Sequence, residues 1–315
     1  MPRVPLHKDD QRVLDLIKAS GRPPLHTLSP AEARAASAAS RTILQLDPPD
    51  IAETRDLVGN GIPLRLYRGA GTAPTTALPC LVYYHGGGWV IGDLDSHDVV
   101  CRTLANLAQC CVIAVHYRLA PEHKFPAAVD DSATATAWII ANATTLHIDP
   151  TRIAVGGDSA GGNLAAVMAL MSRDGTLPPI GYQALIYPVT DLGAVHPSYD
   201  RITDGYVLTT TTMKWFRTHY LRDTADEHDW RASPLRAASL AGTAPAFVLT
   251  CAHDPLCDEG RAYADRLENE GVHVTAIHLS NHMHAYLTMG RFIQASTTTL
   301  TTLATALREH WSAAA

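Results

Sequence analysis

The chain has 315 residues, of which 46% are hydrophobic and 18% charged, and its formal net charge is −6 at neutral pH. This composition is typical of a globular protein with a sizeable core and excludes a disordered chain. The acidic balance and the lack of a Lys/Arg run argue against nucleic acid or an anionic membrane as a partner. No apolar run reaches the roughly 18 residues of a membrane span.

Residues 1–8 carry no apolar stretch of the kind found in a secretory signal peptide, so we expect a cytoplasmic protein. The six cysteines fit reduced thiols in that compartment. Cys251, His253 and Cys257 lie close together in the sequence, but their spacing matches none of the common zinc patterns. We therefore expect no metal ion and no other cofactor, and we leave a homodimer open as the assembly.

The first predicted elements are helices. Asp9–Ala19 and Pro30–Leu46 read as helices, and the second begins at Ser-Pro-Ala-Glu, where the serine caps the helix and the proline occupies its first position. Two prolines then end this segment. Ile51–Val58 and Ile62–Arg68 alternate like short strands, and the Gly-Asn-Gly between them is typical of a hairpin.

Strands and helices alternate in the rest of the chain. The expected strands are Leu81–Tyr84, Cys111–His116, Ile153–Val155, Tyr182–Tyr187, Ala246–Cys251 and Val272–Leu279. The expected helices are His97–Ala108, Pro126–Asn142, Ser159–Met171, Glu259–Glu270 and Phe292–Trp311. Because the strands are almost continuously apolar, the pattern predicts an α/β fold with a mostly parallel sheet and helices on both faces. The polar stretch 191–233, with one aromatic-bearing helix at Thr211–Leu221, breaks the alternation and predicts an inserted lid.

The most informative motif is Gly-Asp-Ser-Ala-Gly at residues 157–161, which lies between an apolar strand and an Ala/Leu-rich helix. In that context Gly-x-Ser-x-Gly is typical of a nucleophile elbow, a sharp turn that exposes the serine hydroxyl above the sheet. A second motif, His-Gly-Gly-Gly at residues 85–88, also follows an apolar strand. Together the motifs predict a nucleophilic serine, Ser159, with a glycine loop nearby.

A serine hydroxyl needs a base, and the base needs a partner that fixes its tautomer. After Ser159 the chain offers Asp254 and His284, each just past a predicted strand. The order Ser, Asp, His is the order in α/β-hydrolases, and the carboxyl ends of parallel strands are where open sheets place their sites. Rival residues lie beside both: Asp258 and Glu259 for the acid, and His282 for the base.

These motifs carry a family resemblance. His-Gly-Gly-Gly-Trp at residues 85–89 is followed by Tyr-Arg-Leu-Ala-Pro-Glu-His at 117–123, the serine motif, Asp-Pro-Leu at 254–256 and His-Ala-Tyr at 284–286. The set, in this order, resembles the hormone-sensitive-lipase family of bacterial esterases in its Gly-Asp-Ser-Ala-Gly branch. The chain departs from the family at residue 285, where alanine replaces the usual glycine.

The resemblance implies an α/β-hydrolase core, residues 49–190 and 234–315, under a cap formed by residues 1–48 and 191–233. It implies hydrolysis of small-molecule esters with short to medium acyl chains, without a cofactor. Ser159 would be the nucleophile, Asp254 the acid and His284 the base. The N–H groups that face the oxyanion would belong to Gly86, Gly87 and Ala160.

Four aromatic residues are candidates for the acyl pocket, although each could equally belong to the core: Trp89, Trp215, Phe216 and Tyr220. Two other functions remain open. An amidase or carbamate hydrolase would use the same triad, and a hydrolase fold without activity could bind a small molecule.

Overall fold

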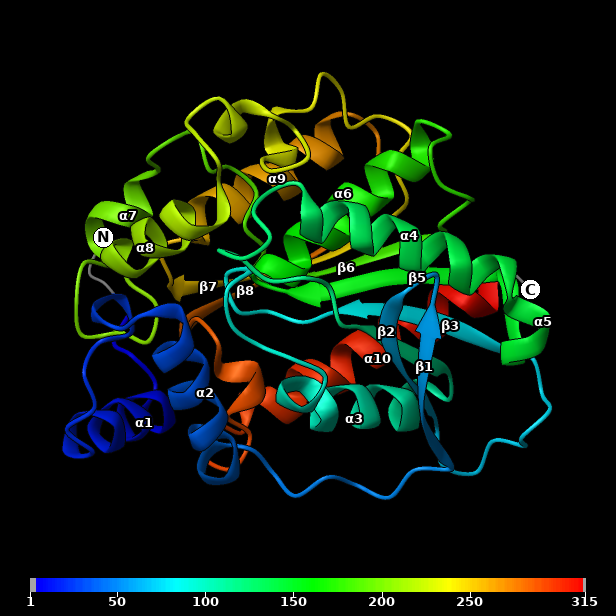
Figure 1. The fold of residues 1–315 in the computed structure, drawn as a ribbon, viewed down its shortest axis with the longest axis horizontal. Coiled ribbons are helices and arrows are strands. Elements are labelled where there is room, and N and C mark those ends of the chain that lie inside the picture. The colour runs from blue at the N-terminus through cyan, green and yellow to red at the C-terminus, as the bar shows by residue number, and fades with distance from the viewer. Residues whose placement is uncertain (1–3, 314–315) are drawn as a thin grey trace.

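The computed structural model describes residues 4–313, which form a central sheet between two layers of helices (Figure 1). The eight strands lie in the order β1-β2-β4-β3-β5-β6-β7-β8. They are β1 (Glu53–Gly59), β2 (Ile62–Arg68), β3 (Leu78–Tyr84), β4 (Cys111–Val115), β5 (Ile148–Asp158), β6 (Tyr182–Ile186), β7 (Ala246–His253) and β8 (Val274–Met283). β2 is antiparallel to both β1 and β4, and all other neighbours are parallel. The predicted α/β fold with a mostly parallel sheet is confirmed.

The central strands are apolar because both of their faces are covered. β4 and β6 are buried at every position, so neither shows the alternation of a half-exposed strand. β5 begins five residues before the predicted start, because Ile148 pairs with Leu78 ahead of an irregularity in the ladder. The polar residues between Ile148 and the apolar run hid this early part of the strand.

Helices cover the sheet in two layers. One layer consists of α3 (Asp98–Ala108) and α10 (Ala295–Ala313), whose apolar sides share a core with one face of the sheet. The other layer consists of α4 (Ala127–Ala141), α5 (Ala143–Leu146), α6 (Ala160–Arg173) and α9 (Cys257–Asn269). α6 is buried from Ala160 to Leu170, and its small residues allow it to lie close against the strands.

The remaining helices gather at one end of the sheet (Figure 1). They are α1 (Lys8–Ala19), α2 (Pro30–Leu44), α7 (Pro197–Arg201) and α8 (Thr210–Tyr220), with short 3-10 turns η1 (Leu25–Thr27), η3 (Asp226–His228) and η4 (Pro234–Arg236). Two further turns, η2 (Asp95–His97) and η5 (Tyr286–Thr288), directly precede α3 and follow β8, respectively. Ser29 caps the start of α2, as the sequence predicts, and Glu32 completes a reciprocal capping box with it.

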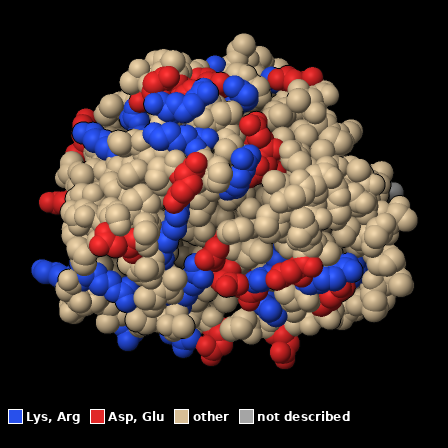
Figure 2. Space-filling model, viewed as in Figure 1, with Lys and Arg blue, Asp and Glu red and all other residues tan. Residues whose placement is uncertain are grey.

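Acidic and basic side chains are interleaved on the face shown in Figure 2. Many of them are paired: Arg65 binds Asp56 at 2.6 Å, and Arg34 binds Glu122 at 2.6 Å. Arg34 lowers the pKa of the Glu122 carboxyl to about 2 through this hydrogen bond. Within residues 4–313, no helix is both long enough and apolar enough to cross a membrane.

Candidate active site

Ser159 lies at the junction of β5 and α6, on a strained turn of the backbone. Its φ and ψ are 56° and −117°, a combination that non-glycine residues rarely adopt. Its N–H donates to the carbonyl of Ile186 on the neighbouring strand at 2.9 Å, which holds the turn in place. Gly161 must be glycine, because a β-carbon there would overlap the carbonyl of Tyr84. This local structure is that of a nucleophile elbow.

His284 joins Ser159 and Asp254 in one chain of hydrogen bonds. Asp254 follows the end of β7, and His284 follows the end of β8. Asp254 Oδ2 lies 2.6 Å from His284 Nδ1, and His284 Nε2 lies 2.9 Å from Ser159 Oγ. Because a carboxylate only accepts, Nδ1 carries the imidazole proton, and Nε2 is left to accept the serine proton. The side chains are nearly inaccessible, with exposed fractions of 0%, 5% and 8% for Asp254, His284 and Ser159.

The rival residues have other partners in the structure. Asp258 binds Arg201 at 2.8 Å. Glu259 is buried and accepts the backbone N–H of Thr190 at 2.7 Å. His282, two residues before His284, binds Asp10 instead. The structure therefore brings together the three residues that the sequence ranks first.

The glycine loop requires one correction. The resemblance implied that the Gly86 N–H faces the oxyanion, but this group donates to Asp158 Oδ1 at 3.0 Å. Within residues 4–313, the N–H groups of Gly87, Gly88 and Ala160 donate to no other backbone or side-chain acceptor. The N–H groups of Gly87 and Gly88, and that of Ala160 directly after Ser159, therefore remain available as donors, whereas the N–H of Gly86 does not.

The carboxylate of Asp158 anchors the glycine loop through its hydrogen bond with Gly86. Its Oδ1 also accepts the Tyr83 hydroxyl at 2.9 Å and lies 2.9 Å from His97 Nε2. Burial alone would raise the pKa of Asp158, but the His97 imidazole and the hydrogen bonds from His97 and Tyr83 bring it below its ordinary value. Asp158 therefore stays an anion, which strengthens its hydrogen bond with the Gly86 N–H.

His85, the first residue of the glycine loop, is a structural residue. Burial and the neighbouring His97 lower its pKa to about 3, so it is neutral at physiological pH. Its ring stacks on Tyr117 at 4.3 Å between centroids, and the Tyr117 hydroxyl donates to the His85 carbonyl at 2.6 Å. These contacts fix the start of the loop.

The four aromatic candidates divide into two groups. Trp89 and Tyr220 are fully buried and stack on each other, with centroids 4.0 Å apart and planes 2° from parallel. The structure therefore places both rings in the core rather than on an open pocket wall. Phe216 lies directly against Gly88, and the half-buried Trp215 contacts the Phe216 ring edge-on at 5.2 Å. α8 thus presents Phe216, which is also buried in this core cluster, to the glycine loop.

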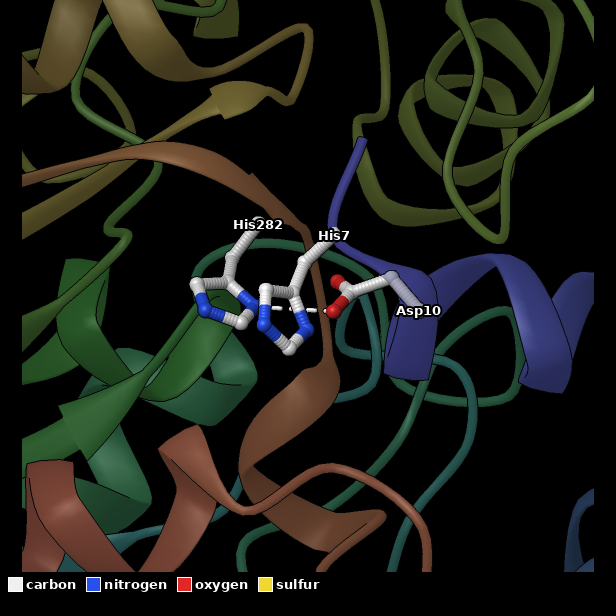
Figure 3. Close-up of side chains that lie close together, drawn as sticks. All are labelled: His7, Asp10 and His282. Carbon is white, nitrogen blue, oxygen red and sulfur yellow. Dashed lines mark hydrogen bonds and ion pairs between the residues drawn. The ribbon is translucent and has the colours of Figure 1, made fainter. Parts of the chain in front are cut away.

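One cluster of side chains with metal-ligating atoms was not expected from the sequence. Among the residues described, potential ligand atoms of His7, Asp10 and His282 lie within 4.8 Å of one another (Figure 3). Sequence spacing could not reveal this group, because Asp10 and His282 are 272 residues apart. Asp10 is already hydrogen bonded through both carboxylate oxygens, as described below.

Comparison with known proteins agrees with the fold described above. A family described as having the alpha/beta hydrolase fold matches residues 81–288. An ethyl acetate hydrolase of Pseudomonas putida is 40% identical over 295 residues, which cover 91% of this chain and 92% of the relative. The carboxylic ester hydrolase LipN of Mycobacterium tuberculosis is 43% identical over 259 residues, covering 80% and 68% of the two chains.

Solved structures give the same result. An ester hydrolase from the metagenome of Lake Arreo superposes with a TM-score of 0.93 at 41% identity, covering 98% of this chain and 99% of that one. A hyperthermophilic esterase of the archaeon Pyrobaculum calidifontis has a TM-score of 0.92 at 37% identity, with 99% and 100% covered. The two relatives named above carry the names of carboxylic ester hydrolases. The chain therefore belongs to the family of α/β-hydrolases that resemble hormone-sensitive lipase.

Proposed function

We propose that this protein is a serine carboxylesterase that hydrolyses esters of short to medium acyl chains through an acyl-enzyme. The observation that carries the proposal is the continuous chain of hydrogen bonds from Asp254 through His284 to Ser159. The names of its relatives, among them the ethyl acetate hydrolase, support an ester as the substrate. The proposed chemistry requires no metal or cofactor, because it needs only these side chains.

In the first step Ser159 Oγ attacks the ester carbonyl carbon while its proton passes to His284 Nε2. Asp254, bound to Nδ1, keeps the imidazole in the required tautomer and stabilises the imidazolium that forms. The imidazolium then gives its proton to the leaving alcohol. Water, deprotonated by the same nitrogen, attacks the acyl-enzyme and releases the acid.

The negative charge that develops on the carbonyl oxygen needs fixed donors. We assign this role to the N–H groups of Gly87, Gly88 and Ala160, which have no other acceptor within residues 4–313. Removal of a single donor of this kind costs about 3 kcal/mol of transition-state stabilisation in a well-studied protease. Gly86 supports the loop through Asp158 instead of binding the oxyanion.

We also propose that α1 and α2 with residues 191–233 form a cap over this site. They gather at one end of the sheet, and α8 packs on η1 (Figure 1). Arg34 of α2 donates to the carbonyl oxygens of Val90 and Ala120 at 2.8 and 2.9 Å, which joins the N-terminal part to the glycine-loop region. The low exposure of Ser159 fits a roofed site.

The test is to trap the acyl-enzyme. Wild-type protein mixed rapidly with p-nitrophenyl acetate should release a burst of p-nitrophenol, and mass spectrometry should find one acetyl group on Ser159. The Ser159→Ala variant should fold normally, show no burst and lose on the order of a millionfold in kcat. Matched ester and amide substrates separate esterase from amidase. A folded wild-type protein without burst or turnover would contradict the proposal.

A further inference from the structure

The N-terminal segment contacts both loops that carry the proposed acid and base. Val4 O accepts a hydrogen bond from His253 Nε2 at 3.0 Å, and His253 directly precedes Asp254. The His7 N–H donates to the carbonyl of Asn281 at 2.7 Å, three residues before His284. Segments at opposite ends of the chain therefore meet beside the triad, although none of these N-terminal groups touches its side chains.

Asp10 makes the most specific of these contacts (Figure 3). Its side chain is completely buried, and both of its carboxylate oxygens are occupied. Oδ1 accepts the backbone N–H of Met283 at 2.9 Å, and Oδ2 accepts from His282 Nδ1 at 2.8 Å. The carboxylate thus binds the main chain and the side chain of the two residues immediately before His284.

The arrangement favours a hydrogen-bonded clamp over a metal site. His7 Nδ1 accepts the Asp9 N–H at 3.2 Å, where it caps α1, while its ring lies 4.9 Å from the His282 ring. An ion at this place would have to displace the donors that Asp10 already holds. A buried carboxylate with two donors, one of them a backbone N–H, is satisfied without an ion.

We propose that Asp10 is a positioning residue for the base. It fixes residues 282–283 against α1 and thereby holds the His284 imidazole between Ser159 and Asp254. The inference rests on the proposed esterase function. The imidazole of His284 has little freedom to move, because it must lie 2.6 Å from Asp254 and 2.9 Å from Ser159 at the same time.

A small shift of the segment before His284 would lengthen at least one of these two hydrogen bonds. A misplacement of about 1 Å caused by a change outside the chemistry can lower a rate about a hundredfold. Substrate binding depends on other surfaces, so the effect should fall on kcat rather than on KM.

The experiment compares three variants of the full-length protein. Asp10→Ala removes both acceptors and should lower kcat about tenfold to a hundredfold, with KM within about twofold. Asp10→Asn keeps an oxygen that can accept the Met283 N–H. Its amide NH₂ lies beside His282, and the neutral imidazole can accept a hydrogen bond at Nδ1 when its proton is on Nε2. It should retain kcat within about threefold of the wild type. Asp15→Ala is the matched control, because Asp15 is an exposed carboxylate of the same helix that accepts a hydrogen bond from its helix neighbour Gln11.

A second readout follows the serine directly. The second-order rate constant for phosphonylation of Ser159 by a small p-nitrophenyl phosphonate reports how well His284 activates the hydroxyl, because the Oγ–P bond forms as p-nitrophenolate leaves and no deacylation step follows. We expect it to fall in Asp10→Ala by the same factor as kcat and to remain unchanged in Asp15→Ala. Thermal unfolding, measured in parallel, sets an assay temperature at which every variant is folded.

Several results would overturn the inference. They are a folded Asp10→Ala enzyme with wild-type kcat and phosphonylation rate, an equal loss in Asp15→Ala, and an Asp10→Asn enzyme as impaired as Asp10→Ala. If Asp10→Ala does not fold, Asp10→Asn, which keeps the side-chain shape, is compared with the wild type instead, and a loss in kcat well beyond the expected value of about threefold overturns the inference. Failure of the esterase proposal is recognised separately, because the wild-type protein would then show no turnover.

Discussion

The ring of Phe216 covers Gly88 so closely that a β-carbon at residue 88 would overlap it. Gly88 also has a φ of 57°, in the left-handed region that favours glycine. Phe216 belongs to α8, which we assign to the cap, whereas Gly88 belongs to the loop that we expect to bind the oxyanion. The contact couples the position of α8 to the position of the donors.

This contact predicts the outcome of a double-mutant experiment. Gly88→Ala should lower kcat/KM about a hundredfold, since the added methyl group pushes Phe216 or the loop away and misaligns an oxyanion donor. Phe216→Ala in the same chain makes room for the methyl group. The double variant should recover at least part of the loss, and kinetics of all three variants test this. A double variant as poor as Gly88→Ala would mean that backbone strain, not the ring, causes the defect.

Substitutions of His282 and His284, the two histidines around the end of β8, should have very different effects on kcat. His284→Ala should reduce kcat nearly as much as Ser159→Ala, because within residues 4–313 His284 is the base that is hydrogen bonded to the Ser159 hydroxyl. His282→Ala removes one hydrogen bond to Asp10 but leaves the Met283 N–H bond in place. We expect this variant to lose about 1 kcal/mol of transition-state stabilisation, which corresponds to a kcat about fivefold lower. Parallel kinetics on purified variants check the contrast, and a near-inactive His282→Ala beside an active His284→Ala would reverse the assignment.

Much of the site follows from the sequence because its determinants are local. The elbow at Ser159 requires glycines within two residues, and Asp254 and His284 each follow a strand that the sequence pattern predicts. Strand ends of a parallel sheet meet at one edge, so chain order was sufficient to select all three residues.

The remainder depends on partners distant in the chain. Gly86 was expected to face the oxyanion, but Asp158, 72 residues away, takes its N–H. The pairing of Trp89 with Tyr220 and the clamp from Asp10 to the base loop likewise join remote segments. An aromatic residue on a helix gives the same pattern whether it faces a pocket or a core, so only the packing could decide.

Glu259 should make stability depend on pH. Burial raises its pKa to about 8 in the folded protein, from about 4.5 as its ordinary value. The folded state therefore binds this proton more tightly than the unfolded state, and the free energy of unfolding falls as pH rises from about 4.5 to 8. Glu259→Gln mimics the neutral acid: its oxygen can accept the Thr190 and Asp191 N–H groups, and its amide can face Tyr199.

The measurement is the difference in Tm between Glu259→Gln and wild type from pH 5 to pH 8. We expect the variant to gain steadily on the wild type as pH rises, since only in the wild type does the side chain at residue 259 ionise on unfolding and so favour the unfolded state. Glu268→Gln, an exposed position on the same helix, is the control and should show a constant difference. A constant difference for Glu259→Gln would show that Glu259 does not carry a raised pKa.

Acyl-chain length should be limited by the cap. Each added CH₂ that enters an apolar pocket contributes up to about 0.8 kcal/mol, so kcat/KM for p-nitrophenyl esters should rise through the short chains. Once the space under α8 is filled, further carbons meet the cap or remain in water, and the rise should stop.

Phe216→Ala, which removes the ring beside Gly88, should move this break to longer chains, whereas Trp215→Ala, one position along the helix, should move it less. The decisive measurement is the ester series from acetate to palmitate with all three proteins. A rate that climbs without a break to palmitate would mean that the cap does not bound the pocket.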